Sequence, residues 1–423
     1  MNTIQSFIKT KFTKETIPFS LQEFSTESQI LLQKILYYIQ ESKKSFLTTE
    51  INSNILTMTK EEFPKNPYFL SIPNKIREII LGSQKIGKEY HFKIGFRNFT
   101  IYIILPYSEE LTKFQTNKMF LFMDQEISRI YEWLYVASQF ANEMKCSPSI
   151  DIYLYWTDHK KEIPEGKSLL DLNEININTG FTIACPIKNN EICIFRYEEW
   201  YKVLIHETFH SFGLDFVYLD ENLTEKAIYK LFPVKTKVQL YEAYNEVWAE
   251  LLQIIFKCYR PIYNDKDVNY YTHKPKWIDG VKYIVFDTFM RDIKKYLDIE
   301  ISFSRLQACK VLNYYGITYK ELCGFNKSST QYNETSGVFS YYIIKNIFLH
   351  FIPDFLNWCI ENNKNSLQFK KSQSNVFRLV HFIKDHYVNE RFTQSMESVE
   401  KWISKHQTNK MMRTLRFTIT GNE

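Results

Sequence analysis

An apolar run at residues 203–212 carries two histidines, His206 and His210, with Glu207 beside the first. On a helix, residues four positions apart stand one turn apart on the same side. That spacing lets both imidazoles reach one metal ion at a bond length of about 2 Å. A polar group buried without a partner costs free energy. The run therefore predicts either a metal-binding helix or a packed helix whose histidines are satisfied by the protein itself.

The flanking sequence predicts a helix at this position and a sheet before it. Residues 197–213 have helical spacing, with acidic residues at the start and Gly213 at the expected stop. Residues 91–107 and 149–157 are rich in β-branched and aromatic residues and predict strands, and residues 179–196 predict a hairpin. We therefore expect an α+β fold in which a small mixed sheet lies beside the histidine helix.

A chain of 423 residues is too long for one simple core, so more than one structural unit is expected. Residues 1–85 are predicted to be mostly helical. Residues 86–262 hold the strands, the histidine helix and a second strong helix at 239–260. Residues 263–423 are predicted to form a mainly helical lobe that closes a cleft.

The charge pattern argues against a nucleic-acid-binding protein. The net charge is +5, and the basic residues are spread along the chain without a basic arm. The first residues lack the apolar core of a secretory signal, and no apolar run is continuous enough to span a bilayer. The sequence therefore predicts a cytoplasmic protein that is not secreted, and it gives no indication of the oligomeric state.

The chain has seven cysteines and no C-x-x-C motif. This odd number at low density is typical of free thiols in a reducing compartment. A pair between Cys185 and Cys193 across the predicted hairpin is the alternative, and free thiols are the expectation.

Residues 206–210 read H-E-x-x-H, and their uncharged flanks resemble the extended motif of zincin metallopeptidases. In that family the two histidines bind zinc, and the glutamate acts as general base on the water that the metal activates. The resemblance therefore implies a zincin-like catalytic core, with His206 and His210 as ligands and Glu207 as the base.

Two histidines leave the site short of one ligand, because catalytic zinc usually has three protein ligands. Residues 245–250 read N-E-x-x-x-E, which is similar to the third-ligand helix of the gluzincin group. This resemblance implies one zinc ion per chain, with Glu246 as the third ligand. It also implies that Glu250 accepts a hydrogen bond from a ligand histidine, with His206 as the expected donor. Many gluzincins have aspartate where this chain has Glu250.

Asp215 is a competing third ligand. Metzincins place theirs six residues after the second histidine, which here is Phe216, so Asp215 is one position short. The sequence favours a structural hydrogen-bonding role for Asp215 near the helix end.

The zincin resemblance also suggests where a substrate lies. Zincins commonly place an edge strand beside the active-site helix, to which an extended peptide adds as a further strand. Residues 178–186 are the candidate here, with an ordinary hairpin strand as the alternative. A donor to the oxyanion is expected after the third ligand, and Tyr341 is nominated. The other candidates are Tyr342, Arg378, His381 and His386.

The function expected from these residues is that of a zinc-dependent metalloendopeptidase acting on an extended polypeptide. The alternative is a non-enzymatic structural or interaction protein that retains a zincin fold. Residues 180–216 also resemble stretches of predicted metalloprotease-like proteins of large cytoplasmic DNA viruses. That likeness implies expression in a host cytoplasm and a possible place in a virion.

Overall fold

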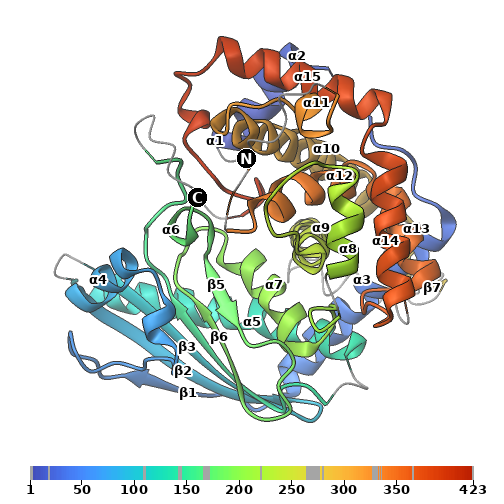
Figure 1. The fold of residues 1–423 in the computed structure, drawn as a ribbon. Coiled ribbons are helices and arrows are strands. Elements are labelled where there is room, and N and C mark those ends of the chain that lie inside the picture. The colour runs from blue at the N-terminus through green and yellow to red at the C-terminus, as the bar shows by residue number, and fades with distance from the viewer. Residues whose placement is uncertain are drawn as a thin grey trace. The chain divides into compact units, whose positions relative to one another are not determined.

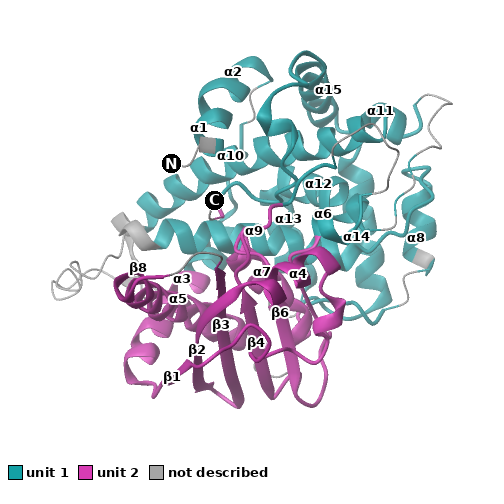
Figure 2. Ribbon diagram, turned by 90° about the vertical axis from the view of Figure 1, so that its left-hand side faces the viewer, with its two compact units in different colours: residues 1–33, 161–177, 215–420 teal, residues 34–160, 178–214, 421–423 magenta. Residues whose placement is uncertain are grey.

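The computed structural model describes most of the chain, in two compact units. One unit comprises residues 1–33, 161–177 and 215–420, and the other comprises residues 34–160, 178–214 and 421–423 (Figure 2). Each unit therefore gathers segments that are far apart in the sequence. The described residues are 3–17, 20–107, 111–141, 145–164, 172–219, 222–262, 277–278, 281–325, 332, 334, 336–363 and 366–421.

The unit that includes residues 34–160 contains a six-stranded mixed sheet with the order β1-β2-β3-β4-β6-β5 (Figure 1). β3, β4 and β6 run parallel, whereas β1, β2 and β5 are antiparallel to their neighbours. β5 lies at one edge and forms an antiparallel hairpin with β6, so residues 178–186 include an edge strand, and its pairing with a substrate stays a prediction. The strands are β1 Asn52–Leu56, β2 Gln84–Ile94, β3 Arg97–Tyr107, β4 Ser149–Tyr155, β5 Gly180–Thr182 and β6 Asn190–Ile194.

Helices cover one face of this sheet. α7 (Trp200–Phe212) packs against β5 and β6, while α5 (Lys113–Phe140) packs against β2 and against α7. Thr112 begins α5 with a capping box that it forms with Gln115. The same unit contains α4 Asn74–Gly82, the short 3₁₀ helix η2 Phe69–Ser71 and, from residue 34 onwards, α3 Thr26–Thr48.

The unit that includes residues 215–420 is mainly helical (Figure 1). The long helices α9 and α10 pack against each other, and α9 also packs against α12. Its elements are α1 Thr3–Phe7, η1 Ile8–Phe12, α2 Thr13–Glu15, α6 Glu174–Ile177, α8 Asn222–Tyr229, α9 Leu240–Ile262, β7 Trp277–Ile278, β8 Val281–Lys282, α10 Tyr283–Tyr314, α11 Tyr319–Leu322, η4 Phe339–Ile344, α12 Lys345–His350, α13 Ile352–Asn362, α14 Gln373–His386, α15 Glu390–Lys405 and η5 Lys410–Met412.

The predicted α+β class is confirmed, as are the mixed sheet beside the histidine helix and the helical C-terminal part. Among the described helices, none is long and apolar enough to cross a membrane.

A glycine in β5 lets α7 approach the sheet closely. A Cβ atom on Gly180 would lie 2.7 Å from the carbonyl oxygen of Cys193 and 2.9 Å from Cγ1 of Val203. Both distances are shorter than a van der Waals contact, so only glycine fits. At its other end α7 stops at Gly213, whose φ of +66° places it in the left-handed region that glycine tolerates.

The cysteines differ from the expectation of free thiols. Cys146 and Cys185 form a disulfide, with their Cα atoms 4.6 Å apart. The alternative pair is also wrong, because Cys193 is a free, buried thiol in β6. The disulfide joins the segment before β4 to the segment after β5, and these two segments come together only in the folded sheet.

We predict that Gly180→Ala destabilises the protein by about 1–3 kcal/mol, because the added methyl group overpacks the contact between β5 and α7. Chemical denaturation measures the change in the free energy of unfolding. Gly82→Ala is the matched control, because a Cβ atom there meets nothing within 4 Å. Equal stability of the two variants would show that α7 does not need this close approach.

A second prediction concerns Glu191, which stands opposite Asp151 in the register of β4 and β6. Burial and the neighbouring Asp151 carboxylate raise the pKa of Glu191 to about 7. An acid whose pKa is raised by folding favours the folded state below its unfolded pKa, and that contribution is lost as the pH rises towards 7. Relative to the wild type, Glu191→Gln should therefore stabilise the protein more at pH 8 than at pH 5, by on the order of 1 kcal/mol after allowance for solvent screening.

Denaturation of both proteins at the two pH values tests this difference. The exposed Glu62→Gln serves as control, and a pH response of Glu191→Gln equal to that of the wild type would contradict it.

Candidate metal centre

The helix that carries both histidines is buried along its whole length. All 13 residues of α7, from Trp200 to Phe212, are buried. On the α5 side, the indole of Trp133 donates a hydrogen bond to Oγ1 of Thr208 over 3.0 Å and stacks on the ring of Phe209. Thr208 in turn donates to the carbonyl oxygen of Leu204. The histidines are therefore held on a helix that is fixed by its neighbours.

A buried arginine holds the chain where it enters α7. Arg196 donates hydrogen bonds to the carbonyl oxygens of Asn178, His159 and Lys160 over 2.9–3.2 Å. Burial lowers the pKa of Arg196 to about 10, and the nearby Glu198 and Glu199 oppose this. The guanidinium thus remains charged at neutral pH. It connects the segment just before β5 to the loop that follows β4.

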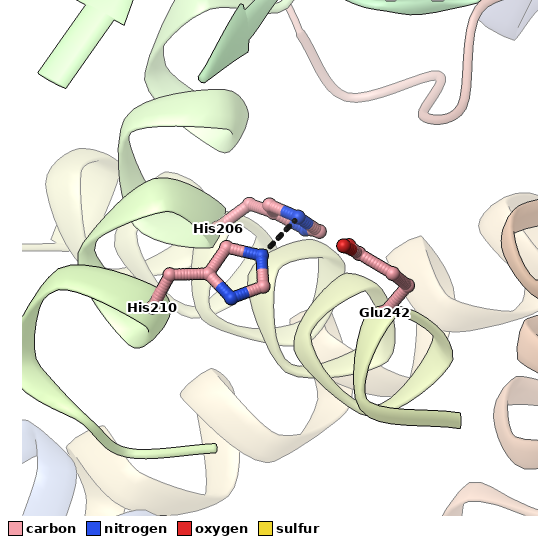
Figure 3. A group of neighbouring side chains, drawn as sticks. All are labelled: His206, His210 and Glu242. Carbon is pink, nitrogen blue, oxygen red and sulfur yellow. Dashed lines mark hydrogen bonds between the residues drawn. The ribbon is translucent and has the colours of Figure 1, made fainter. Parts of the chain in front are cut away.

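The two imidazoles meet through their Nε2 atoms, which are 3.2 Å apart (Figure 3). His206 and His210 are 6% and 8% exposed. Two nitrogen ligands of a tetrahedral zinc ion, at bond lengths of about 2.0–2.1 Å, are about 3.3 Å apart. The observed separation matches that value. It also suits a hydrogen bond between one ring that is protonated on Nε2 and one that is not.

The carboxylate that lies beside the histidines is that of Glu242, in the first turn of α9. The ligand atoms of His206, His210 and Glu242 all lie within 4.8 Å of one another. Figure 3 shows the three side chains pointing towards one another. Two imidazoles and a carboxylate form the donor set of several catalytic zinc sites, whereas structural zinc sites are usually rich in cysteine. This group can therefore bind a metal ion.

The sequence instead predicts Glu246 as the third ligand, one helical turn further along α9. Glu246 is only 1% exposed, and Glu242 is half-buried. The carboxylate in the metal-capable group is thus not the predicted one, and ligation by Glu246 stays a prediction. The available signal was the four-residue spacing of Glu242, Glu246 and Glu250, which places three carboxylates along one side of a helix.

Glu250 has a different partner from the histidine that was predicted for it. Its Oε1 accepts a hydrogen bond from Nζ of Lys345 over 2.7 Å, and both side chains are almost fully buried. Burial raises the pKa of Glu250, the Lys345 ammonium opposes this, and the carboxylates of Glu300 and Glu246 reinforce it. The observed role of Glu250 is therefore in an ion pair inside the helical unit.

Glu207, the predicted base, is 7% exposed on α7. Burial raises the pKa of the Cys193 thiol, and the charges of Glu191 and Glu207 add to this effect. The Glu207 carboxylate therefore lies close enough to β6 for its charge to raise the pKa of Cys193. Glu207 directly follows His206 on α7, and its role as the base stays a prediction.

Asp215 follows the end of α7 and accepts a hydrogen bond from Nδ2 of Asn245 over 3.0 Å. Both residues are buried. This contact confirms the structural hydrogen-bonding role that the sequence favoured for Asp215.

Tyr341, the nominated oxyanion donor, lies in the π-helical turn η4, with its ring 5.4 Å from that of Phe417. The competing Tyr342 donates its hydroxyl hydrogen to the carbonyl oxygen of Leu415, and His386 lies against Asp354. These contacts give both competitors structural partners. The catalytic role of Tyr341 remains a prediction.

Comparison of the chain with protein-family models, with curated proteins and with solved structures finds no match. The function of this chain is therefore inferred from the site itself.

We predict that Glu242→Ala weakens metal binding, probed with zinc, by about tenfold or more, because a bound ion would lose its carboxylate ligand. Isothermal titration with zinc, together with metal analysis of the purified protein, measures this loss. Glu246→Ala is the informative comparison, and the exposed Glu174→Ala is the control. Normal zinc binding by Glu242→Ala combined with loss in Glu246→Ala would assign the ligand role to Glu246.

Proposed function

We propose that this chain is a zinc-dependent endopeptidase of the gluzincin type. The observation that carries the proposal is the group of His206, His210 and Glu242, together with Glu207 on the same buried helix. The 3.2 Å separation of the two Nε2 atoms fits a tetrahedral ion, so the residues present suit zinc. A purely structural site has no need of the carboxylate of Glu207.

In this proposal the three side chains hold the ion, which supplies Lewis acidity towards water and towards the carbonyl group of a peptide. Glu207 accepts the proton of the attacking water and then delivers it to the leaving amine. The buried contacts of α7 keep Glu207 and the two histidines in a fixed relation, which limits the reorganisation needed during the reaction.

The substrate in this proposal is an extended polypeptide that pairs with the edge strand β5. An edge strand presents unpaired backbone groups, and such a peptide gains main-chain hydrogen bonds by adding to it. β5 packs against α7, so a peptide at this edge would run beside the histidine helix. Just beyond β5, Ile183 is 41% exposed and is available for contact with a substrate side chain.

We predict that Glu207→Gln keeps zinc but loses hydrolysis by about 10²–10⁴-fold, because the amide cannot accept the proton. Zinc content and cleavage of a denatured-protein or peptide library are measured on the same preparation. Cleavage by the wild type should stop with a chelator and return with added zinc. Glu174→Gln is the control.

Loss of zinc from Glu207→Gln would contradict the role of Glu207 as a base. A wild-type protein that binds zinc tightly, yet cleaves nothing across a broad library, would favour the alternative of a non-enzymatic protein with a structural metal.

A further inference from the structure

The Cys146–Cys185 disulfide lies at the end of α7 that carries His210. Cys146 is 2% exposed, whereas Cys185 is partly exposed. Cys185 follows the edge strand β5 by three residues, and Cys146 precedes β4. The crosslink therefore fixes the edge strand to the body of the sheet.

Both sides of this crosslink bind the last turn of α7. The backbone N–H of Cys185 donates to the carbonyl oxygen of His210 over 2.9 Å. On the other side, Oγ of Ser147, the residue after Cys146, donates to the carbonyl oxygen of Ser211 over 2.8 Å. The final carbonyls of a helix have no partner within the helix, so these contacts help to complete its C-terminal turn.

A buried amide strengthens the same connection. Nδ2 of Asn190 donates to Oγ of Ser147 over 3.0 Å and to Oγ of Ser211 over 2.8 Å. The N–H of Ser147 also donates to the carbonyl oxygen of Pro186 over 2.7 Å. The segments before β4 and after β5 are thus joined to each other and to α7 by a compact set of hydrogen bonds around the disulfide.

The backbone at both sides of the crosslink is in the left-handed region. Ser147 has a φ of +51° and Cys185 a φ of +41°. Residues other than glycine rarely adopt this conformation, which persists only when the surrounding structure imposes it. Release of the crosslink removes one of the constraints that hold these two residues in place.

We propose that the Cys146–Cys185 disulfide is a reversible redox site that a dithiol reductant can reduce. Its reduction loosens the C-terminal turn of α7 and the edge strand β5. Zinc binding then weakens because His210 lies in that turn. This consequence for zinc rests on the proposed function, whereas the loosening of α7 and β5 does not.

Reduction of the disulfide proceeds by two successive thiol–disulfide exchanges. One thiolate of the reductant attacks Sγ of Cys185, the more exposed of the two residues, and the electron pair of the broken S–S bond passes to Sγ of Cys146. The second thiolate of the reductant then attacks the first sulfur of the same reductant molecule, which is bonded to Sγ of Cys185, and releases the Cys185 thiolate. The reductant leaves as a cyclic disulfide, and its two protons end on the two protein thiols.

A buried arginine favours the first step. Nε of Arg97 donates to the carbonyl oxygen of Cys146 over 3.3 Å. Burial lowers the pKa of Arg97 to about 10, so the guanidinium stays charged at neutral pH. The positive charge held at the backbone of Cys146 favours negative charge on that residue when the S–S bond breaks.

The test uses the metal-free full chain, either oxidised in air or reduced with dithiothreitol that is then removed without oxygen. Mass spectrometry after alkylation reports the state of each cysteine, and hydrogen–deuterium exchange reports the looseness of each segment. We expect Cys146 and Cys185 to be protected before reduction and labelled after it. Residues 178–187 and 204–213 should exchange about tenfold faster or more after reduction, with α15 unchanged.

The double variant Cys146→Ser/Cys185→Ser should show the hydrogen–deuterium exchange rates of the reduced protein, and dithiothreitol should not change them. Cys323→Ser, which removes a free and partly exposed thiol, should keep the full response. Zinc affinity, measured by competition with a coloured chelator, should fall about tenfold or more on reduction.

Alkylation of either cysteine in the oxidised protein, or equal hydrogen–deuterium exchange in the two states, would overturn the inference. A protein that binds no zinc in either state would instead refute the proposed function, and the exchange rates would still decide the inference.

Discussion

The burial of α7 on all sides is the constraint on which the arrangement around it depends. A helix with all 13 of its residues buried must find a partner for every polar group that it carries. Thr208 accepts a hydrogen bond from Trp133, and Ser211 accepts one from Asn190. The two histidines meet each other, at a separation that an ion can bridge. The metal-capable geometry is thus a consequence of burying a largely apolar helix that carries a few polar side chains.

The sequence predicted the elements around the site well, because their signals are local. The helix from Trp200 to Phe212, its stop at Gly213 and the hairpin of β5 and β6 were all read from residues within a few positions of each other. β1 was missed, since Asn52–Leu56 is largely exposed and begins with residues that have low strand propensity. Its place in the sheet comes from pairing with β2 rather than from its own side chains.

Features that depend on distant segments were outside the reach of the sequence. The pairing of Cys146 with Cys185 spans 39 positions and requires β4, β5 and β6 to be aligned first. The assignment of Glu242 rather than Glu246 to the metal-capable group is a similar case. Periodicity places both on one side of α9, but it does not say which turn of that helix comes opposite the histidines.

The acidic residues of α9 show how a buried helix tolerates several negative charges. Glu242, Glu246 and Glu250 follow one another at intervals of one turn, and Glu246 and Glu300 raise the pKa of Glu250 by their charge. Lys345 compensates for this at the Glu250 end. Such repulsion along a buried stripe falls when positive charge is present at either end. A cation bound at Glu242 would supply it at the other end, so binding of the metal and stability of α9 should favour each other.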